Sequence, residues 1–291
     1  MTRITLTIGG QHREYLLFVP NSPAGGEGRP LVILLHGAGG TAGWADGETG
    51  WSALATREGF ALALPEARPP DPTQPPKFLT NPQRWNDGSP GPTGEPSVED
   101  DVGFLAGVID DAIHRAGIDP TRVYLTGFSN GAGMTFRAAA ELSSRLAAVA
   151  PVAGYCRVPA DARLARPVPT FYLIGTADTL VPLRGGDVRS PWLHRLIRRP
   201  PVASSLETWA GLIRCAIVPI IESDMDGVQV DVYPGAVEFR VMMVKGLGHH
   251  WPGGKGQLNH RIAGPPSNRV DATTEIWRFF QRHQLPVRLT G

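Results

Sequence analysis

The 291-residue sequence has little cysteine, little net charge and no long apolar segments. Its two cysteines, Cys156 and Cys215, cannot form the disulfide framework of a small secreted domain; they form one bridge if the protein is exported, or remain two buried thiols if it is not. The net charge of +1 gives no electrostatic basis for binding nucleic acid or an anionic membrane. No apolar run reaches membrane-spanning length. We therefore expect neither nucleic-acid binding nor a membrane span.

The amino terminus also lacks the features of a signal peptide. Residues 1–8 alternate between polar and apolar side chains, which is typical of a β-strand, and they contain no uninterrupted apolar core. We therefore expect that this chain carries no signal peptide.

The remaining composition is that of a soluble globular enzyme, with 42% hydrophobic and 19% charged residues. A chain of this length can bury a large core. No internal repeat and no change in composition marks a boundary, so we predict a single domain over residues 1–291. Glycines and prolines gather between periodic segments, and the least regular stretch, residues 65–96, is predicted to be a long loop.

Apolar segments with strand character alternate with amphipathic segments along the chain. The predicted strands are 4–8, 15–19, 31–35, 60–64, 122–126, 147–153, 169–174, 228–233 and 237–244. The predicted helices are 41–59, 132–142, 205–215, 271–281 and one that is capped by Ser97, with Asp100 in a capping box and a core-facing stripe from Val98 to Ile113. This alternation predicts an α/β fold with a mostly parallel, doubly wound sheet and helices on both faces.

The stretch Gly127-Phe128-Ser129-Asn130-Gly131 lies between a predicted strand and an Ala-rich predicted helix. In this context Gly-x-Ser-x-Gly is typical of a nucleophile elbow, because its glycines permit a tight turn that exposes the serine hydroxyl. The helix amino terminus adds partial positive charge where an oxyanion would form. A glycine-rich turn with a solvated serine fits the motif alone equally well, so other residues must decide.

A serine nucleophile needs a base and an acid that orients the base. Ser129, Asp178 and His249 each follow a predicted strand, and the carboxyl ends of parallel strands converge on one crevice. The order Ser, Asp, His is that of α/β-hydrolases. Asp178 as a turn or cap aspartate is the alternative for the acid. His250 is the alternative base; we favour His249 because it directly follows Gly246-Leu-Gly248. The loop 65–96 is then expected over the active-site face.

Two backbone N–H groups are needed to bind the oxyanion. Asn130 follows the nucleophile and is predicted to supply one; Ala38, after the strand 31–35, is predicted to supply the other, with Gly39 as the alternative. His36 is expected to bond the loop and to transfer no proton.

A metal site is a competing use of His249, His250 and His260. Their spacing matches no ligand pattern, and adjacent histidines rarely bind one ion together. We therefore expect no metal and no other cofactor.

Six motifs occur in one order along the chain: His36-Gly-Ala-Gly-Gly40, Trp85-Asn86-Asp87, Asp100-Asp-Val-Gly-Phe-Leu105, Gly127-Phe-Ser-Asn-Gly131, Gly175-Thr-Ala-Asp178, and Gly248-His249 followed by Trp251-Pro252-Gly253-Gly254. With these motifs the sequence resembles the esterases related to poly(3-hydroxybutyrate) depolymerases, close to feruloyl and acetylxylan esterases of carbohydrate esterase family 1. The resemblance covers nearly the whole chain. It implies an α/β-hydrolase fold, no cofactor, and ester hydrolysis by a triad that falls on Ser129, Asp178 and His249.

The chain departs from this family at three places. Members are usually exported, whereas this chain begins almost at its first strand, so both an extracellular and a cytoplasmic location stay open. Ile174 stands where relatives often have histidine before Gly-Thr, which we expect to affect packing more than catalysis. Residues 191–201 carry Trp192, His194, Arg195, Arg198 and Arg199, as either a solvated basic loop or a rim that binds an acidic or polyhydroxylated leaving group.

Three residues near the predicted site are candidates for contact with substrate. Trp85 in the long loop and Trp251 beyond the base could line an acyl or aromatic pocket, with core packing as the alternative. His250 is expected in the cleft wall or on the surface.

We therefore expect a serine carboxylic ester hydrolase that forms an acyl-enzyme on a small-molecule or polymeric ester. Polyhydroxyalkanoate-type, feruloyl or acetyl, and small acyl esters all remain possible substrates. The alternatives are a peptidase or thioesterase with the same triad, and a hydrolase-fold binding protein without turnover.

Overall fold

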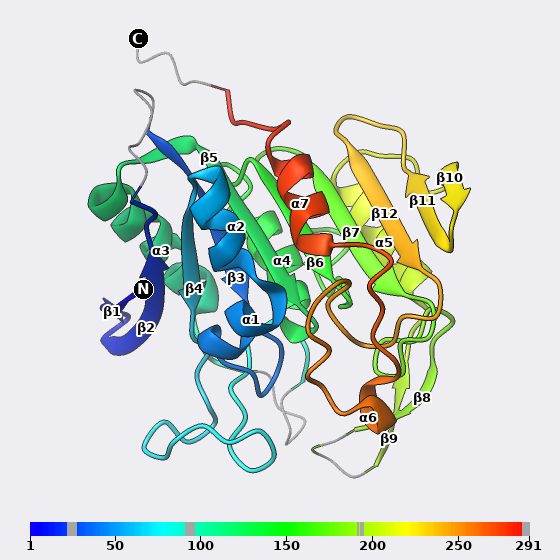
Figure 1. Cartoon of the computed structure of the whole chain (residues 1–291), viewed down its shortest axis with the longest axis horizontal. Coiled ribbons are helices and arrows are strands. Elements are labelled where there is room, and N and C mark those ends of the chain that lie inside the picture. The colour runs from blue at the N-terminus through cyan, green and yellow to red at the C-terminus, as the bar shows by residue number, and fades with distance from the viewer. Residues whose placement is uncertain (22–27, 91–96, 191, 193–194, 287–291) are drawn as a thin grey trace.

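The computed structural model describes residues 1–21, 28–90, 97–190, 192 and 195–286. The strands are β1 Thr2–Ile8, β2 Gln11–Phe18, β3 Arg29–Leu35, β4 Ala61–Pro65, β5 Ile118–Phe128, β6 Ala148–Val152, β7 Thr170–Gly175, β8 Gly186–Arg189, β9 Leu196–Arg199, β10 Ile220–Met225, β11 Val228–Val232 and β12 Phe239–Val244. All but β8 and β9 form one sheet, in the order β1-β2-β4-β3-β5-β6-β7-β12-β11-β10 (Figure 1). The central strands from β4 to β12 are parallel, and antiparallel strands complete both edges.

Helices cover both faces of this sheet. Their bounds are α1 Ala42–Thr49, α2 Trp51–Glu58, α3 Asp101–Ala116, α4 Asn130–Glu141, α5 Val202–Leu212, α6 His260–Ala263 and α7 Ala272–Phe280. Helices α3, α4 and α5 pack their apolar side chains on one face, and α1, α2 and α7 pack theirs on the other (Figure 1). The predicted α/β fold with a mostly parallel sheet covered on both faces is therefore confirmed.

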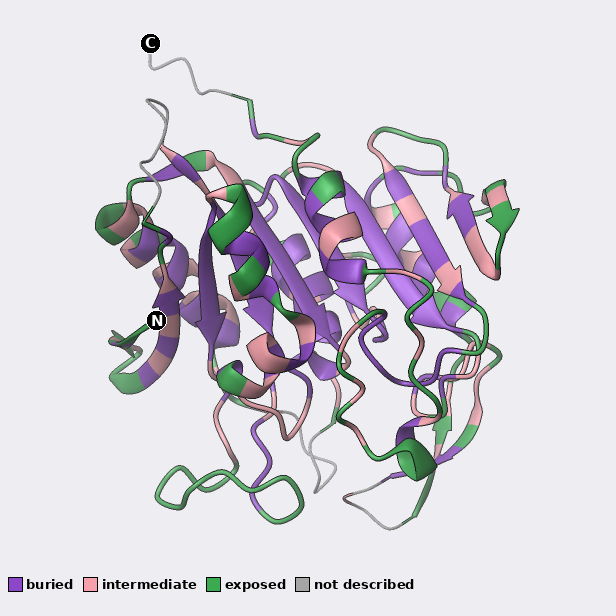
Figure 2. Cartoon of the chain, viewed as in Figure 1, coloured by how far each residue is buried: buried purple, intermediate pink, exposed green. Residues whose placement is uncertain are grey.

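The central strands are apolar along their whole length because both of their faces are covered. The run Leu31–Leu35 in β3 is buried throughout, and so are β4, β6 and β7, as the purple strands in Figure 2 show. A strand with two covered faces needs no polar alternation. Burial of these side chains on both faces supplies the main free energy that holds the layers together.

Two of the predicted helices begin or divide differently in the structure. The segment 41–59 is two helices, since Gly50 adopts a left-handed conformation with φ 72° and ends α1 before α2 begins. The prediction that Ser97 caps the third helix is wrong: Asp100 is the N-cap of α3, and its Oδ1 accepts a hydrogen bond of 2.8 Å from the Gly103 amide. Val98 precedes the helix and is 95% exposed, so it is not part of the core-facing stripe.

The sequence patterns did not reveal β8, β9 and β10. Strand β10 is acidic and exposed, with Glu222 and Asp224 in its sequence, and acidic residues are poor strand formers. It forms because Asp226 and Gly227, both with positive φ, make a tight turn that pairs it with β11. The Asp-Gly pair was the available signal. In segment 191–201, residues 191, 193 and 194, including His194, lie outside the described residues, and β9 occupies the later part.

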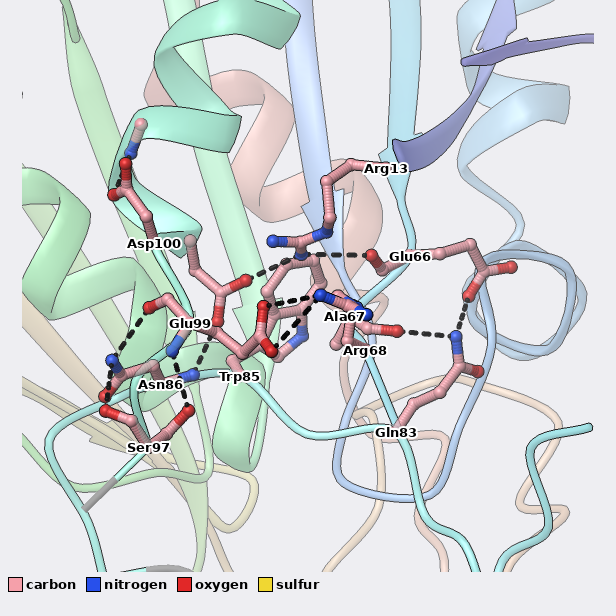
Figure 3. Close-up of polar contacts among 12 residues, drawn as sticks. Arg13, Glu66, Ala67, Arg68, Gln83, Trp85, Asn86, Ser97, Glu99 and Asp100 are labelled. Carbon is pink, nitrogen blue, oxygen red and sulfur yellow. Dashed lines mark hydrogen bonds and ion pairs between the residues drawn. The ribbon is translucent and has the colours of Figure 1, made fainter. Parts of the chain in front are cut away.

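Polar contacts tie the described part of the loop 65–96 to itself and to the segment that leads into α3 (Figure 3). The side-chain amide of Gln83 donates to the carbonyl of Ala67 at 2.7 Å and to Glu66 at 3.1 Å. The side-chain amide of Asn86 donates to the carbonyls of Ser97 and Glu99, at 3.0 and 2.9 Å. These bonds satisfy polar groups that a loop packed against a sheet edge would otherwise bury without partners.

A buried ion pair joins this loop to the first hairpin and to α3. Arg13 of β2 and Asp101 of α3 are 2.6 Å apart, with side chains 2% and 0% exposed. The second carboxylate oxygen of Asp101 accepts from the Asn86 amide at 2.6 Å, and the Arg13 guanidinium lies 4.1 Å from the centre of the Phe104 ring. Both charges are thus partnered on several sides, as buried charges must be.

Both cysteines are free thiols in the structure, so the bridge that the sequence left open is not formed. Burial raises the pKa of the Cys156 thiol to about 12 and also raises that of Cys215. In the described ranges, no helix is both long enough and apolar enough to cross a bilayer.

We predict that Asp101→Ala lowers the free energy of unfolding by about 3–5 kcal/mol, because it leaves the Arg13 charge buried without its partner. Denaturant titration followed by circular dichroism measures this change. The matched control is Glu14→Gln, which breaks the exposed Arg3–Glu14 pair and is expected to cost no more than about 1 kcal/mol. Equal costs for the two variants would contradict the role given to the buried pair.

Candidate active site

Ser129 stands at the sharp turn between β5 and α4. Its backbone has φ 57° and ψ −115°, a conformation that costs a non-glycine residue on the order of 1–3 kcal/mol. The turn is tight enough to need glycine beside it: a Cβ on Gly127 would lie 2.4 Å from the Gly131 carbonyl oxygen, and one on Gly131 would lie 2.6 Å from the carbonyl oxygens of Leu35 and His36. The motif therefore exists because no side chain fits at either glycine.

The structure brings the three predicted triad residues together. His249 Nε2 lies 2.9 Å from Ser129 Oγ, and His249 Nδ1 lies 2.8 Å from Asp178 Oδ2. A carboxylate can only accept, so Nδ1 carries the proton and Nε2 is free to accept from the serine hydroxyl. The three residues follow β5, β7 and β12, whose carboxyl ends lie at the same edge of the sheet.

Asp178 is oriented by backbone amides as well as by the histidine. Its Oδ1 accepts from the amides of Leu180 at 2.9 Å and Val181 at 2.7 Å, and the residue is only 5% exposed. These two bonds fix the orientation of the carboxylate, so that its Oδ2 faces His249. Asp178 therefore combines the two roles considered for it. It accepts hydrogen bonds from the amides of its own turn through Oδ1, and its Oδ2 bonds His249.

His249 is held by close packing of the loops that follow β7 and β12. A Cβ on Gly175 would lie 2.0 Å from the Leu247 carbonyl oxygen, so only glycine lets the two loops approach. The His249 amide donates to the Ala263 carbonyl oxygen at 2.5 Å, and the Phe128 ring centre lies 4.8 Å from the imidazole. These contacts fix the ring beside Ser129.

The amides of Ala38 and Asn130 have no acceptor among the described residues. Both residues line a cavity at Ser129. The alternative donor, Gly39, is already engaged, because its amide donates to the Gln83 carbonyl oxygen at 2.8 Å. Ala38 and Asn130 therefore have amides that can accept a new partner, as an oxyanion hole requires.

His36 is fully buried and bonded on both ring nitrogens. Its Nδ1 lies 2.8 Å from the Gly37 carbonyl oxygen, and its Nε2 lies 3.1 Å from the Ala67 amide. The carbonyl fixes the proton on Nδ1, and Nε2 accepts from the amide. Burial lowers the pKa of His36 to about 4. The neutral ring thus links the Ala38 loop to the start of the long loop, in agreement with the expected structural role.

The three tentative substrate residues do not line the cavities at Ser129. Trp85 and Trp251 are each 2% exposed; their indole N–H groups donate to the His36 carbonyl oxygen and to Thr273 Oγ1, both at 2.9 Å. His250 is 1% exposed, and its Nε2 lies 2.9 Å from the Gly264 carbonyl oxygen. These side chains pack in the core and hold loops, as the core-packing alternative for the two tryptophans describes. Contact with substrate stays an untested prediction.

Two supporting residues were missed by sequence analysis. The side chain of Asn130 accepts from the Trp85 amide at 2.7 Å and donates to the Trp85 carbonyl oxygen at 3.1 Å. Glu48, 3% exposed on α1, accepts from the amides of Gly256 and Gln257 at 2.8 and 3.1 Å. The position of Asn130 directly after Ser129 predicts a role for its backbone amide, but it does not predict one for its side chain. No sequence pattern predicts a role for Glu48.

Among the residues that the structure describes, two cavities at Ser129 differ in character. The larger, of about 450 Å³, is lined by His249 and by apolar side chains that include Trp44, Phe78, Leu258 and Ile262. The smaller, of about 250 Å³, is lined by four arginines and Tyr155. Phe78 and Arg84 come from the loop 65–96, so its described part does lie over the site, at the lower end of the sheet in Figure 1.

Histidines near the site do not gather as ligands would. The rings of His250 and His260 are 5.4 Å apart, but His249 is bonded to Ser129 and Asp178. The described part of the chain holds no group of three or more His, Cys, Asp or Glu side chains that could bind one ion.

Comparison with known proteins gives consistent relatives. The family model described as "Esterase PHB depolymerase" matches residues 13–165. NocK of Nocardia uniformis subsp. tsuyamanensis, which carries the name of an esterase, is 32% identical over 284 residues, covering 91% of this chain and 78% of NocK. Feruloyl esterase B of Piromyces equi is 28% identical over 268 residues, and the match covers 84% of this chain but only 44% of that enzyme.

Solved structures share the fold at lower identity. The acetyl xylan esterase from Aspergillus awamori superposes with a TM-score of 0.61 at 16% identity, covering 86% of this chain and 94% of that one. At this identity the likeness concerns the fold alone.

We predict that the His36 ring makes folding stability depend on pH. The folded pKa of about 4 lies below the ordinary value of 6.5, so between these values only the unfolded chain binds the proton and stability is lost as the pH falls. The full effect is about 3 kcal/mol.

His36→Gln keeps a donor and an acceptor but cannot titrate. We expect the difference in unfolding free energy between wild type and this variant to shrink by about that amount from pH 7 to pH 4, measured by urea denaturation. His12→Gln, at an exposed position on β2, is the control. A difference that is the same at both pH values would contradict the prediction.

Proposed function

The chain belongs to the PHB depolymerase esterase family and is an esterase with the α/β-hydrolase fold; we propose that it hydrolyses carboxylic esters through an acyl-enzyme on Ser129. We propose that residues 1–291 form the single domain that carries this activity. The substrates are polyhydroxyalkanoate-type, feruloyl or acetyl, or small acyl esters. The observation that carries the proposal is the hydrogen-bonded chain Ser129–His249–Asp178, with distances of 2.9 and 2.8 Å. Beside it are the amides of Ala38 and Asn130, which have no acceptor in the part of the chain that the structure describes.

In the first step the hydroxyl of Ser129 attacks the ester carbonyl carbon while His249 Nε2 takes its proton. Asp178 stabilises the imidazolium that forms and keeps the ring oriented. The developing oxyanion accepts hydrogen bonds from the amides of Ala38 and Asn130. Each such donor contributes roughly 10²–10³ in kcat, and the amino terminus of α4 adds a favourable dipole.

In the second step His249 gives its proton to the leaving alcohol oxygen, and the acyl group remains on Ser129. A water then enters on the side of His249, loses a proton to Nε2 and attacks the acyl carbon. His249 returns the proton to Ser129 Oγ, which frees the carboxylic acid. The leaving alcohol must therefore lie on the His249 side of the scissile carbon. The apolar cavity of about 450 Å³ is on that side.

We predict that Ser129→Ala lowers kcat on p-nitrophenyl butyrate by a factor of about 10⁴ or more, because the nucleophile is lost while the fold is kept. Circular dichroism verifies folding. Wild type, but not the variant, is expected to be labelled covalently by a fluorophosphonate probe. A wild-type protein that stays unlabelled would support a binding protein without turnover and overturn the proposal.

The adjacent histidines provide a matched pair of variants. We predict that His249→Gln loses activity to a similar degree as Ser129→Ala, whereas His250→Gln keeps kcat within about tenfold, since His250 supports a loop and does not contact Ser129. Steady-state kinetics on p-nitrophenyl butyrate measures both. Loss in the His250 variant together with retention in the His249 variant would assign the base to His250. Parallel assays with a butyryl thioester and a p-nitroanilide test the thioesterase and peptidase alternatives.

A further inference from the structure

Four arginine side chains line the smaller cavity at Ser129: Arg84, Arg157, Arg195 and Arg199. Among the described residues, none of the four forms an ion pair with a carboxylate. One carboxylate, Asp87, lines the same cavity. Its Oδ1 is already bonded to the amide and hydroxyl of Ser89. The cavity wall thus carries a clear excess of positive charge.

Like charges gathered in this cavity are energetically unfavourable for one another. Burial lowers the pKa of Arg84 and of Arg199. The Asp87 carboxylate raises the pKa of Arg84 by more than the Arg157 charge lowers it, whereas at Arg199 the lowering by Arg157 exceeds the raising by Asp87. Like charges that approach each other in a partly desolvated site raise each other's free energy. An anion bound between them would reverse the sign of this interaction.

Tyr155 and Arg199 also present buried polar atoms without partners. Tyr155 is 6% exposed, and within the described ranges its hydroxyl has no hydrogen-bond partner; the buried Nε of Arg199 likewise has none there. The guanidinium carbons of Arg157 and Arg199 lie 5.7 and 6.0 Å from the Tyr155 ring centre. Leaving a buried donor unsatisfied costs about 1–3 kcal/mol per group, so such groups indicate a missing acceptor.

The position of His249 decides which half of the ester enters this cavity. His249 lines the apolar cavity and not the arginine-lined one. Asn130 lines the arginine-lined cavity and not the apolar one, and Ala38 and Ser129 line both. Since His249 protonates the leaving oxygen, the alcohol half occupies the apolar side. The acyl half, which stays on Ser129, then extends from the oxyanion-binding amides into the arginine-lined cavity.

We propose that the acyl half of the preferred substrate carries a carboxylate, which is bound by Arg84, Arg157, Arg199 and the Tyr155 hydroxyl. The substrate class is thus a half-ester of a dicarboxylic acid with an apolar alcohol. Of the two possibilities for segment 191–201, the structure favours anion binding, but on the acyl side of the scissile bond and not on the leaving-group side. Arg195 lies at the exposed rim of this cavity and Arg199 inside it. This inference rests on the proposed esterase function.

The test compares three p-nitrophenyl esters of equal leaving group: the adipate half-ester, its neutral terminal amide and the hexanoate. We expect kcat/KM for the adipate half-ester to exceed that for the amide by about tenfold or more, the value of one charge-assisted hydrogen bond. A fourth substrate, 4-carboxyphenyl hexanoate, puts the carboxylate on the alcohol and is expected to gain nothing over 4-carbamoylphenyl hexanoate.

Variants locate the effect in the cavity. Arg157→Gln, Arg199→Gln and Tyr155→Phe are each expected to lower kcat/KM for the adipate half-ester much more than kcat/KM for its terminal amide, so that most of the adipate preference is removed. The matched control is Arg198→Gln: Arg198 neighbours Arg199 on β9, but its side chain is 81% exposed and lies 3.6 Å from Asp187. This variant is expected to keep the wild-type preference.

The outcomes separate this inference from the proposed function. Hydrolysis of the hexanoate ester that depends on Ser129, without preference for adipate over its amide, would overturn the inference and leave the esterase proposal standing. A preference for the carboxylate on the alcohol half would overturn the assignment to the acyl side. If no ester is turned over, calorimetric titration of Ser129→Ala with monomethyl adipate and with its amide still decides: equal affinities overturn the inference, and tighter binding of the acid supports it.

Discussion

The site depends on one pair of hydrogen bonds, between the side chain of Asn130 and the backbone of Trp85. Asn130 begins α4 directly after Ser129, so its position is set by the strained turn. Its side chain bonds the backbone of Trp85 and so fixes the loop 65–96 relative to Ser129. This loop supplies Phe78 to the apolar cavity and Arg84 to the arginine-lined cavity. The residue whose amide we propose to bind the oxyanion thus also fixes the walls of both cavities at Ser129. Buried amide pairs of this kind have two partners satisfied at once, which gives them rigidity.

Much of the fold and the identity of the central residues could be predicted from the sequence. The apolar run Leu31–Leu35 and the order Ser129, Asp178, His249 suffice, because parallel strands buried on both faces bring their carboxyl ends to one edge. The strand β10 escaped prediction since its stability comes from pairing across the Asp226-Gly227 turn and not from its own residues. Local patterns describe local preference, and tertiary pairing overrides them.

The direction of side chains next to the site was the harder problem. Trp251 and His250 are close in sequence to His249, yet both turn into the structure. Sequence proximity to a reactive group gives position along the chain, whereas orientation depends on backbone angles in an irregular loop that no periodicity describes. The cavity walls are instead built by Phe78, Arg199 and Leu258, which come from three distant segments. Such convergence is a property of the folded chain only.

Residues 245–259, here called the histidine loop because they carry His249, are anchored by Glu48. This anchoring affects how the protein reaches its folded state. Glu48 bonds the Gly256 amide across 208 positions, and Ser129 meets His249 across 120. Closing loops of this length is entropically costly and slows folding, because the stabilising contacts form only after the loop has closed. The nucleophile turn and its helix are local, and can form early. The histidine loop can reach its final place only after the distant α1 is already in position, so we expect the competent site to be among the last parts of the molecule to assemble.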